Sequence, residues 1–209
     1  MRLTDYYSRT TERSEAWADQ ANTAGFAPEA ALMTAARPLV VRGERVLDIG
    51  CQGGHQLALV RDLFGEAAGI DIADYTAMWQ QFPDIDFSLH DVDSAPLPFP
   101  DAHFDFVICT NVIEHVFDVF GLVGEIARVV RPGGQVLINV PNIAHLRHIV
   151  SLARGRVPRT GAFVDPFTES DGWDGQHLHY FTPTDLGGLL SAAGLTPSQR
   201  LHIGRQFYR

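Results

Sequence analysis

The feature that most constrains the fold is the stretch VLDIGCQGG, residues 46–54. Its first four residues predict a strand, and the glycines after them predict a tight turn that opens a helix at about His55. In α/β folds this arrangement lets the backbone approach a nucleotide cofactor. The stretch alone is compatible with NAD, FAD, S-adenosylmethionine or no cofactor, so residues further along the chain must decide.

Composition narrows the class of partner. The chain has 209 residues, enough for one substantial domain, with a formal charge of −9 and a pI near 5.3. This charge argues against capture of nucleic acid or of an anionic membrane. All sixteen basic residues counted as Lys and Arg are arginine, which excludes lysine Schiff-base chemistry and a Walker-type lysine. We therefore expect a small-molecule partner.

The two cysteines and the absence of long apolar runs indicate the cellular compartment. Cys51 and Cys109 lie within predicted strand and turn sequence, which favours reduced thiols over a disulfide scaffold, although sequence leaves a bridge open. The first residues lack the apolar core of a signal peptide, and no uncharged apolar run approaches the roughly 20 residues of a membrane span. We expect a cytoplasmic protein without a membrane segment.

From residue 45 onward, strands and helices alternate, which predicts a mostly parallel sheet covered on both faces. The predicted strands are 45–49, 67–72, 85–90, 104–110 and 134–140, with two further strands at 195–203 and 206–209. The predicted helices are 28–37, 54–64, 73–81, 118–131, 142–153 and 182–193. We expect one structural unit, with residues 1–40 as an N-terminal helical cap, residues 41–209 as the main domain and residues 154–181 as a loop or lid.

A carboxylate follows the second predicted strand. Asp71 comes 17 residues after Gly54, at the edge of the sheet where the glycine turn also lies. There it can accept hydrogen bonds from both hydroxyls of a ribose. NAD enzymes also bind the ribose through a carboxylate at this position, so Asp71 does not distinguish the cofactors. The distinction depends on the later segments 90–93 and 97–105.

Four blocks together resemble the class I S-adenosylmethionine-dependent methyltransferases. They are VLDIGCQGG, GIDI, HDVDSAPLPFPDAHFDFVICTNVIEHV and VVRPGGQVLINVPN, in the order and spacing of that family. The resemblance covers residues 45–140 closely and extends to 193. It implies a Rossmann-like α/β fold with a seven-stranded, mostly parallel sheet, helices on both faces and an antiparallel last strand.

The resemblance also implies a cofactor site for S-adenosylmethionine. Its candidate residues are Asp48, Gly50, Cys51, Gly54, Asp71, Ile72, Asp91, Val92, Asn111 and His115. Gly50 and Gly54 would supply backbone around the amino-acid portion of the cofactor, and Asp71 would hold the ribose. Asp91 and the backbone of Val92 would meet the adenine.

Asn111 and His115 would flank the methionyl end of the cofactor. Three alternatives remain open along these blocks. Asp93 is close enough in sequence to replace Asp91, and Glu114 fits a structural role near the start of a helix. Gln52 stands where many family members have glycine, and Gly53 beside it can absorb the change.

The segment HLHYFT, residues 177–182, resembles segments of methionine-biosynthesis W-type and ubiquinone-type methyltransferases, in the small type-11/23-like branch. By that match His177 is the candidate catalytic residue, as a base or to orient the acceptor, because imidazole titrates near neutral pH. Alternatively it bonds loop carbonyls. A metal held by His177 and His179 with Asp165 or Asp174 is a weaker hypothesis, and we expect no metal.

Four arginines follow the fifth predicted strand: Arg147, Arg154, Arg156 and Arg159. They could bind a carboxylate or phosphate group on the acceptor. Alternatively, they are ordinary solvent-exposed arginines.

The sequence therefore predicts a metal-independent methyltransferase that uses S-adenosylmethionine, releases S-adenosylhomocysteine and acts on a small molecule. O-methylation is favoured over N-methylation, and a monomer or homodimer is expected. Two other functions remain: a partner or regulatory subunit that binds S-adenosylmethionine without turnover, and an NAD-dependent oxidoreductase.

Overall fold

The computed structural model describes residues 27–158, residue 160 and residues 177–201. The predicted final strand at 206–209 and most of the predicted lid lie outside the described residues. The first described element is helix α2, Ala27–Ala36, followed by the 3₁₀ helix η1, Arg37–Leu39. Helix α2 coincides, to within one residue at each end, with the helix predicted over 28–37.

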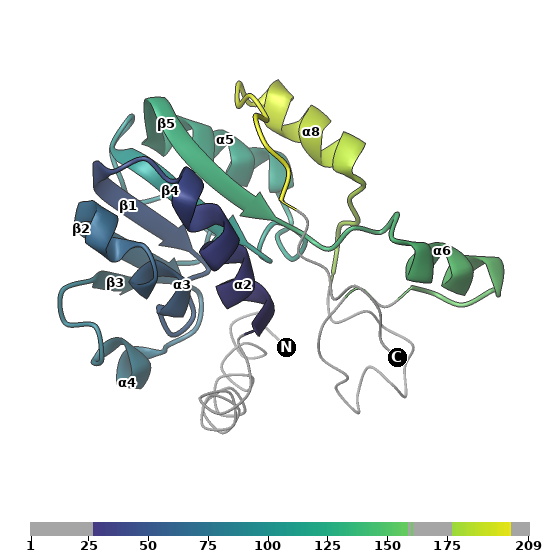
Figure 1. Ribbon diagram of the computed structural model, residues 1–209, viewed down its shortest axis with the longest axis horizontal. Coiled ribbons are helices and arrows are strands. Elements are labelled where there is room, and N and C mark those ends of the chain that lie inside the picture. The colour runs from purple at the N-terminus through teal and green to yellow at the C-terminus, as the bar shows by residue number, and fades with distance from the viewer. Residues whose placement is uncertain (1–26, 159, 161–176, 202–209) are drawn as a thin grey trace.

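A parallel sheet forms the centre of the described fold (Figure 1). Its strands are β1 (Gly43–Ile49), β2 (Phe64–Asp71), β3 (Asp86–Leu89), β4 (Phe104–Thr110) and β5 (Val130–Asn139). They lie in the order β3-β2-β1-β4-β5. The order reverses between β1 and β4, and at such a switch point α/β sheets open a crevice beyond the carboxyl ends of their strands.

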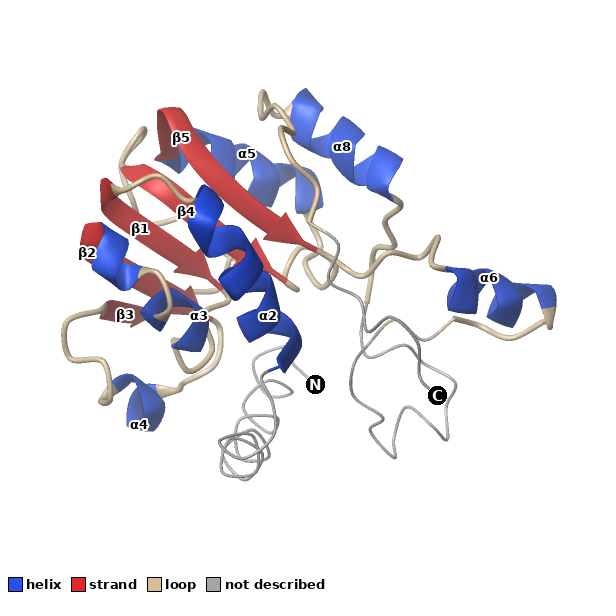
Figure 2. Ribbon diagram, in the orientation of Figure 1, coloured by secondary structure: helices blue, strands red, loops and turns tan. Residues whose placement is uncertain are grey.

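Helices cover both faces of the sheet, as the alternating pattern predicts (Figure 2). On one face, α2 and α3 (His55–Ala58) bury Met33 and Leu57 against Val46 and Ile108. On the other face, α5 (Val119–Val129) and α8 (Pro183–Ala192) pack on a core that includes Leu47 and Val107. These packed layers fix the strand ends from which the candidate site is built.

The best-predicted helices start at side-chain caps. The Asp118 carboxylate accepts from the Gly121 N–H at 2.8 Å at the start of α5. Thr182 and Asp185 form a reciprocal capping box at the start of α8. Gly194, with φ +82°, follows the end of α8. Local sequence therefore sets these boundaries closely.

Three other helices are shorter than predicted. The helix expected over 54–64 is divided into α3 and the 3₁₀ helix η2, Arg61–Leu63, because Val60 leaves helical geometry where its side chain enters the core. The helix expected over 73–81 is reduced to α4, Thr76–Trp79. The helix expected over 142–153 begins only at α6, Leu146–Ala153, where the His145 side chain accepts from Arg147 N–H.

The expected seven strands and antiparallel last strand are not seen in the described part of the chain, which contains five strands, all parallel. Residues 195–201 form no strand. Residues 196–200 are all exposed, so they lack the alternating burial of a strand that packs one face on a core.

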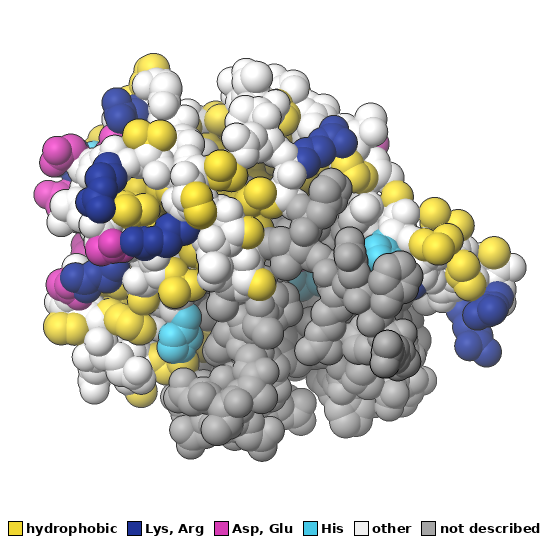
Figure 3. Space-filling view, viewed as in Figure 1, with side chains coloured by type: hydrophobic (Ala, Val, Ile, Leu, Met, Phe, Trp, Pro, Cys, Tyr) yellow, Lys and Arg dark blue, Asp and Glu magenta, His cyan; other side chains and the backbone are white. Residues whose placement is uncertain are grey.

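Helix α6 extends away from the sheet and presents apolar side chains to solvent (Figures 1 and 3). Leu146, Ile149 and Leu152 are at least half exposed. The three described arginines of the predicted cluster are exposed too, at positions 147, 154 and 156, which fits their solvated alternative. Within the described residues, no helix has the length and apolar character needed to traverse a bilayer.

Candidate functional site

The glycine turn leaves β1 in a strained backbone path. Gly50 and Gly54 have φ values of +73° and +82°, where a side chain is strained. Gln52 also adopts a left-handed φ of +44°, so it takes up the unusual geometry itself and Gly53 does not. Its carbonyl accepts from the Trp79 indole N–H at 2.6 Å. This contact and a second one, made by Asp71, hold the turn in place.

Asp71 lies at the end of β2, with 7% of its surface exposed. Its carboxylate accepts backbone N–H groups from Gln52 at 2.8 Å and from Ala73 at 2.9 Å. Burial raises the pKa of this carboxyl, and the two N–H donors oppose the shift. A carboxylate has about four lone-pair positions, so these two bonds leave capacity for ribose hydroxyls. The residue predicted to bind the cofactor thus also shapes the glycine turn.

Asp48 and Cys51 flank the start of the turn but are buried. Asp48 is 0% exposed within β1, two residues before Gly50. Cys51 is 4% exposed, and Cys109 on the neighbouring β4 is 0% exposed. Both thiols are free, and burial raises the pKa of each. Among the described residues the cysteines are therefore reduced, as the sequence favours.

The loop after β3 is held to the loop after β4. Asp91 accepts from Asp93 N–H and Ser94 Oγ, so its carboxylate organises its own loop. Asp93 instead accepts from the N–H of Phe117 at 2.9 Å. The structure thus gives these aspartates different roles. Asp91 remains beside Val92, at the place predicted for the adenine, and Asp93 fixes the loop against the segment that precedes α5.

The segment after β4 carries the remaining predicted cofactor residues. Asn111 has φ +54°, and its side-chain oxygen accepts from Asn139 Nδ2 at 3.0 Å. A turn then joins Val112 to His115 through a backbone bond of 2.9 Å. Val112 packs against Gly50, where any Cβ would overlap it. The turns that follow β1 and β4 are therefore in direct contact.

Glu114, for which the sequence favours a structural role, is buried beside the candidate site. It is 1% exposed, and neither carboxylate oxygen has a hydrogen-bond partner among the described residues. Burial raises the pKa of this carboxyl to about 8. A buried polar group of this kind calls for a functional explanation. Its position in the turn that follows the central strand β4, next to His115, is the signal that points to it.

His177 lies directly against this turn. Its ring and that of His115 meet edge to face, with centroids 4.6 Å apart. His177 Nδ1 is 2.5 Å from the Thr160 hydroxyl. His179 does not join the group, because its Nε2 lies 2.9 Å from the Val116 carbonyl. The predicted metal pair of His177 and His179 is therefore not assembled, and its partners Asp165 and Asp174 lie outside the described residues.

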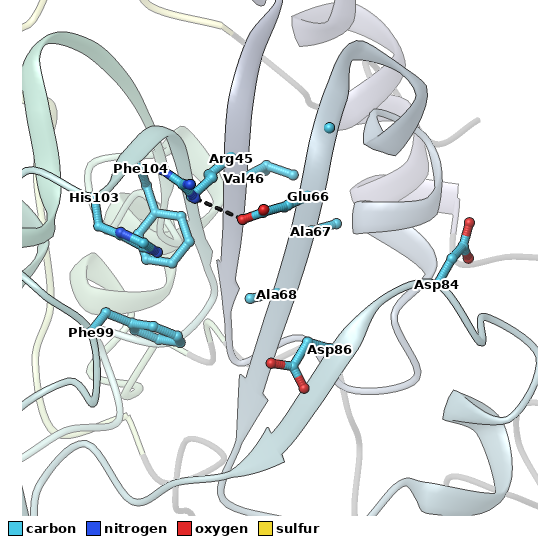
Figure 4. A pocket seen from close by; sticks show the side chains of 11 residues that line it. Arg45, Val46, Glu66, Ala67, Ala68, Asp84, Asp86, Phe99, His103 and Phe104 are labelled. Atoms are coloured by element: carbon cyan, nitrogen blue, oxygen red, sulfur yellow. Dashed lines mark hydrogen bonds and ion pairs between the residues drawn. The ribbon is translucent and has the colours of Figure 1, made fainter.

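A separate pocket of about 400 Å³ contains none of the predicted site residues (Figure 4). It is lined by Arg45, Glu66 and Asp86, with Phe99 and Phe104, and Arg45 Nε pairs with Glu66 at 2.7 Å. Arg45 and Asp86 stand near the amino ends of their strands, away from the glycine turn. In a parallel α/β sheet, ligands bind beyond the carboxyl ends of the strands. We therefore place the candidate site at the carboxyl ends, beside the glycine turn, and not in this pocket.

The Asp71 carboxylate provides a direct test of the predicted cofactor site. Asp71→Ala should weaken binding of S-adenosylhomocysteine by about 1–3 kcal/mol, because a ribose acceptor is lost. It should also lower stability, since the Gln52 and Ala73 N–H groups lose their partner. Calorimetric titration and thermal unfolding separate the two effects. A folded variant with unchanged affinity would remove Asp71 from the cofactor site.

Comparisons with known proteins agree with this geometry. A family model described as a methyltransferase domain matches residues 11–199. A Mycolicibacterium smegmatis protein assigned to the S-adenosylmethionine-dependent methyltransferases is 36% identical over 102 residues, 48% of this chain and 39% of that protein. The ubiquinone biosynthesis O-methyltransferase of Paracidovorax citrulli is 34% identical over 109 residues, 49% of this chain and 45% of the relative.

Each of these matches spans less than half of the relative's own length. Among solved structures, the complex of the Haloferax volcanii Trm112 methyltransferase activator with a methyltransferase gives a TM-score of 0.70. The match has 20% identity and covers 100% of this chain and 83% of that one. At this identity the likeness concerns the fold.

Proposed function

The chain belongs to the family of class I S-adenosylmethionine-dependent methyltransferases, and we propose that it methylates a small-molecule acceptor, with oxygen favoured over nitrogen as the receiving atom. The observation that carries the proposal is the position of His115 and His177. Both rings lie beside the turn that packs on the glycine loop, so groups able to handle a proton adjoin the predicted cofactor site. The likeness to an O-methyltransferase supports oxygen.

The residues present fit S-adenosylmethionine. The left-handed glycines bring backbone to the crevice, and Asp71 keeps acceptor capacity beside it. Bound there, the cofactor supplies a methyl carbon that is activated by its sulfonium. The protein's part is to align the acceptor and manage its proton, because a hydroxyl must lose one. His177 can take that proton or orient the acceptor.

A turnover assay tests the function. Purified protein with S-adenosylmethionine and a panel of hydroxyl and amine acceptors should form S-adenosylhomocysteine, detected by mass spectrometry. S-adenosylhomocysteine alone should raise the unfolding temperature. Cofactor binding without turnover on any acceptor, together with co-purification of an enzyme, would favour the partner-subunit alternative. Protection by a nicotinamide nucleotide in its place would favour the oxidoreductase.

His177→Ala tests the chemical end of the site. We expect kcat to fall by about 100-fold or more, as for loss of a general base, while affinity for S-adenosylhomocysteine changes little. His179→Ala is the matched control, because that ring contacts the Val116 carbonyl. It should change kcat only a few-fold. Equal losses of kcat and cofactor affinity in His177→Ala would place His177 outside the chemistry.

A further inference from the structure

Three side chains from two distant parts of the chain meet at the mouth of the candidate site. Glu114, His115 and His177 each offer one ligating atom, and these atoms all lie within 4.8 Å of one another. We propose that they bind a divalent transition-metal cation of the zinc type. One carboxylate with two imidazoles is a donor set that holds zinc in enzymes while leaving a coordination position open.

The buried carboxylate is the first support for this assignment. Glu114 is 1% exposed, and both of its oxygens lack a hydrogen-bond partner among the described residues. Its Oε1 lies 4.0 Å from His115 Nε2. Burial of an acidic group without hydrogen bonds is costly, and coordination of a cation offsets that cost.

The main chain holds the three ligands together. The N–H groups of Leu178 and His179 both donate to the Glu114 carbonyl, at 2.7 and 3.1 Å. Segment 177–179 is therefore hydrogen-bonded to the turn that carries Glu114 and His115. This gives the side chains a fixed relative position before any cation arrives, and such preorganisation lowers the cost of binding.

The His177 ring has the outer contact that metal ligands usually show. Its Nδ1 is 2.5 Å from Thr160 Oγ1. A ligating histidine commonly donates its other ring N–H to a neighbouring acceptor, which fixes the tautomer and the ring orientation. The Thr160 hydroxyl is itself in a buried residue, 6% exposed, so this contact is shielded from water.

The catalytic consequence rests on the proposed function, whereas cation binding does not. An open coordination position would accept the acceptor's hydroxyl oxygen and lower its pKa, so that its proton passes to water. His177 would then orient the acceptor through the cation. Of its two candidate roles, base and orienting residue, this arrangement favours the second. This revises the expectation of a metal-free site.

Binding of Zn²⁺ itself is the test. Protein freed of metal by chelator should bind one Zn²⁺ in calorimetric titration. Glu114→Gln and His177→Ala should each weaken that binding by at least about tenfold. His179→Ala should leave it unchanged, although it removes an imidazole from the same segment. Circular dichroism and protection by S-adenosylhomocysteine verify that each variant is folded.

A second measurement, of Co²⁺ binding, uses the unmodified protein. Its result therefore does not depend on whether a variant folds. Co²⁺ added to the metal-free protein should give the intense visible absorption of four- or five-coordinate cobalt, and Zn²⁺ should displace it. Only the weak spectrum of hydrated Co²⁺, or equal Zn²⁺ affinity in Glu114→Gln, would overturn the proposal. Because neither readout uses turnover, failure of the methyltransferase function would leave this result intact.

Discussion

We expect the chain to lose stability as pH rises from 6 to 8 in the presence of a chelator, and Glu114→Gln to remove much of that loss. Burial raises the pKa of this carboxyl to about 8, against 4.5 for the exposed group. Between these values the folded state keeps a proton that the unfolded state releases. The free energy of unfolding therefore falls as pH rises, by about 2 kcal/mol over this interval from this group alone.

Denaturant unfolding at pH 6, 7 and 8 gives the free energy of unfolding of each protein. The slope of this free energy against pH is compared between Glu114→Gln and the unmodified protein. Contributions from groups that do not contact Glu114 are the same in both proteins and cancel in this comparison. Glu125→Gln is the control. The Arg128 guanidinium holds the pKa of Glu125 below its usual value, so that contribution is lost only under more acidic conditions. Parallel pH dependences of Glu114→Gln and the unmodified protein would show that Glu114 ionises freely, and the buried assignment would be wrong.

The framework of the cofactor site was predictable because its signals are local. Strand β4 matches its predicted range, β1 ends at Ile49 as predicted, directly before the glycine turn, and β2 ends at Asp71, one residue before its predicted end. Asp71 lies at the strand end, as predicted, because the carboxyl ends of parallel strands share one edge; its role toward a cofactor stays a prediction. Its second contact, with the Gln52 N–H, depends on the left-handed turn, which the sequence alone does not specify.

The Glu114, His115 and His177 cluster was not predictable in the same way. Close spacing suggested His177 with His179, yet the chain turns His179 toward the Val116 carbonyl. The contact that matters joins segment 177–179 to the turn after β4 through Glu114, and it is a long-range main-chain pairing. Neither periodicity nor a local motif encodes such a pairing. Only the position of Glu114 shortly after strand β4 pointed to this region.

The absence of a strand over residues 195–201 has a related cause. In the segment 195–201 only Leu195 packs on the core, and Pro197 with the polar residues 196–200 is exposed, so the segment has no alternating buried face. The family resemblance supplied the expectation of seven strands, whereas the residues themselves gave it little support. Where local pattern and resemblance agree, as in β1 and β4, the structure follows both.

Gly54→Ala should be among the most damaging single-methyl additions in the described chain. The residue has φ +82°, and an added Cβ would lie 2.6 Å from Phe87 Cζ. The Phe87 ring is stacked on Trp79 with centroids 5.0 Å apart, so it has little room to retreat. Left-handed strain and overpacking together cost about 2–4 kcal/mol. The midpoint temperature of thermal unfolding should fall by on the order of 10 °C.

Gly187→Ala separates this effect from the general consequences of replacing glycine. Gly187 lies inside α8, where an added Cβ meets nothing within 4 Å, so alanine should stabilise the helix by roughly 0.5–1 kcal/mol. The same chemical change thus has opposite signs at the two positions. Gly54→Ala should also weaken binding of S-adenosylhomocysteine, because the backbone of the turn must shift. If Gly54→Ala matched Gly187→Ala in stability and kept full affinity, the turn would be neither strained nor part of the cofactor site.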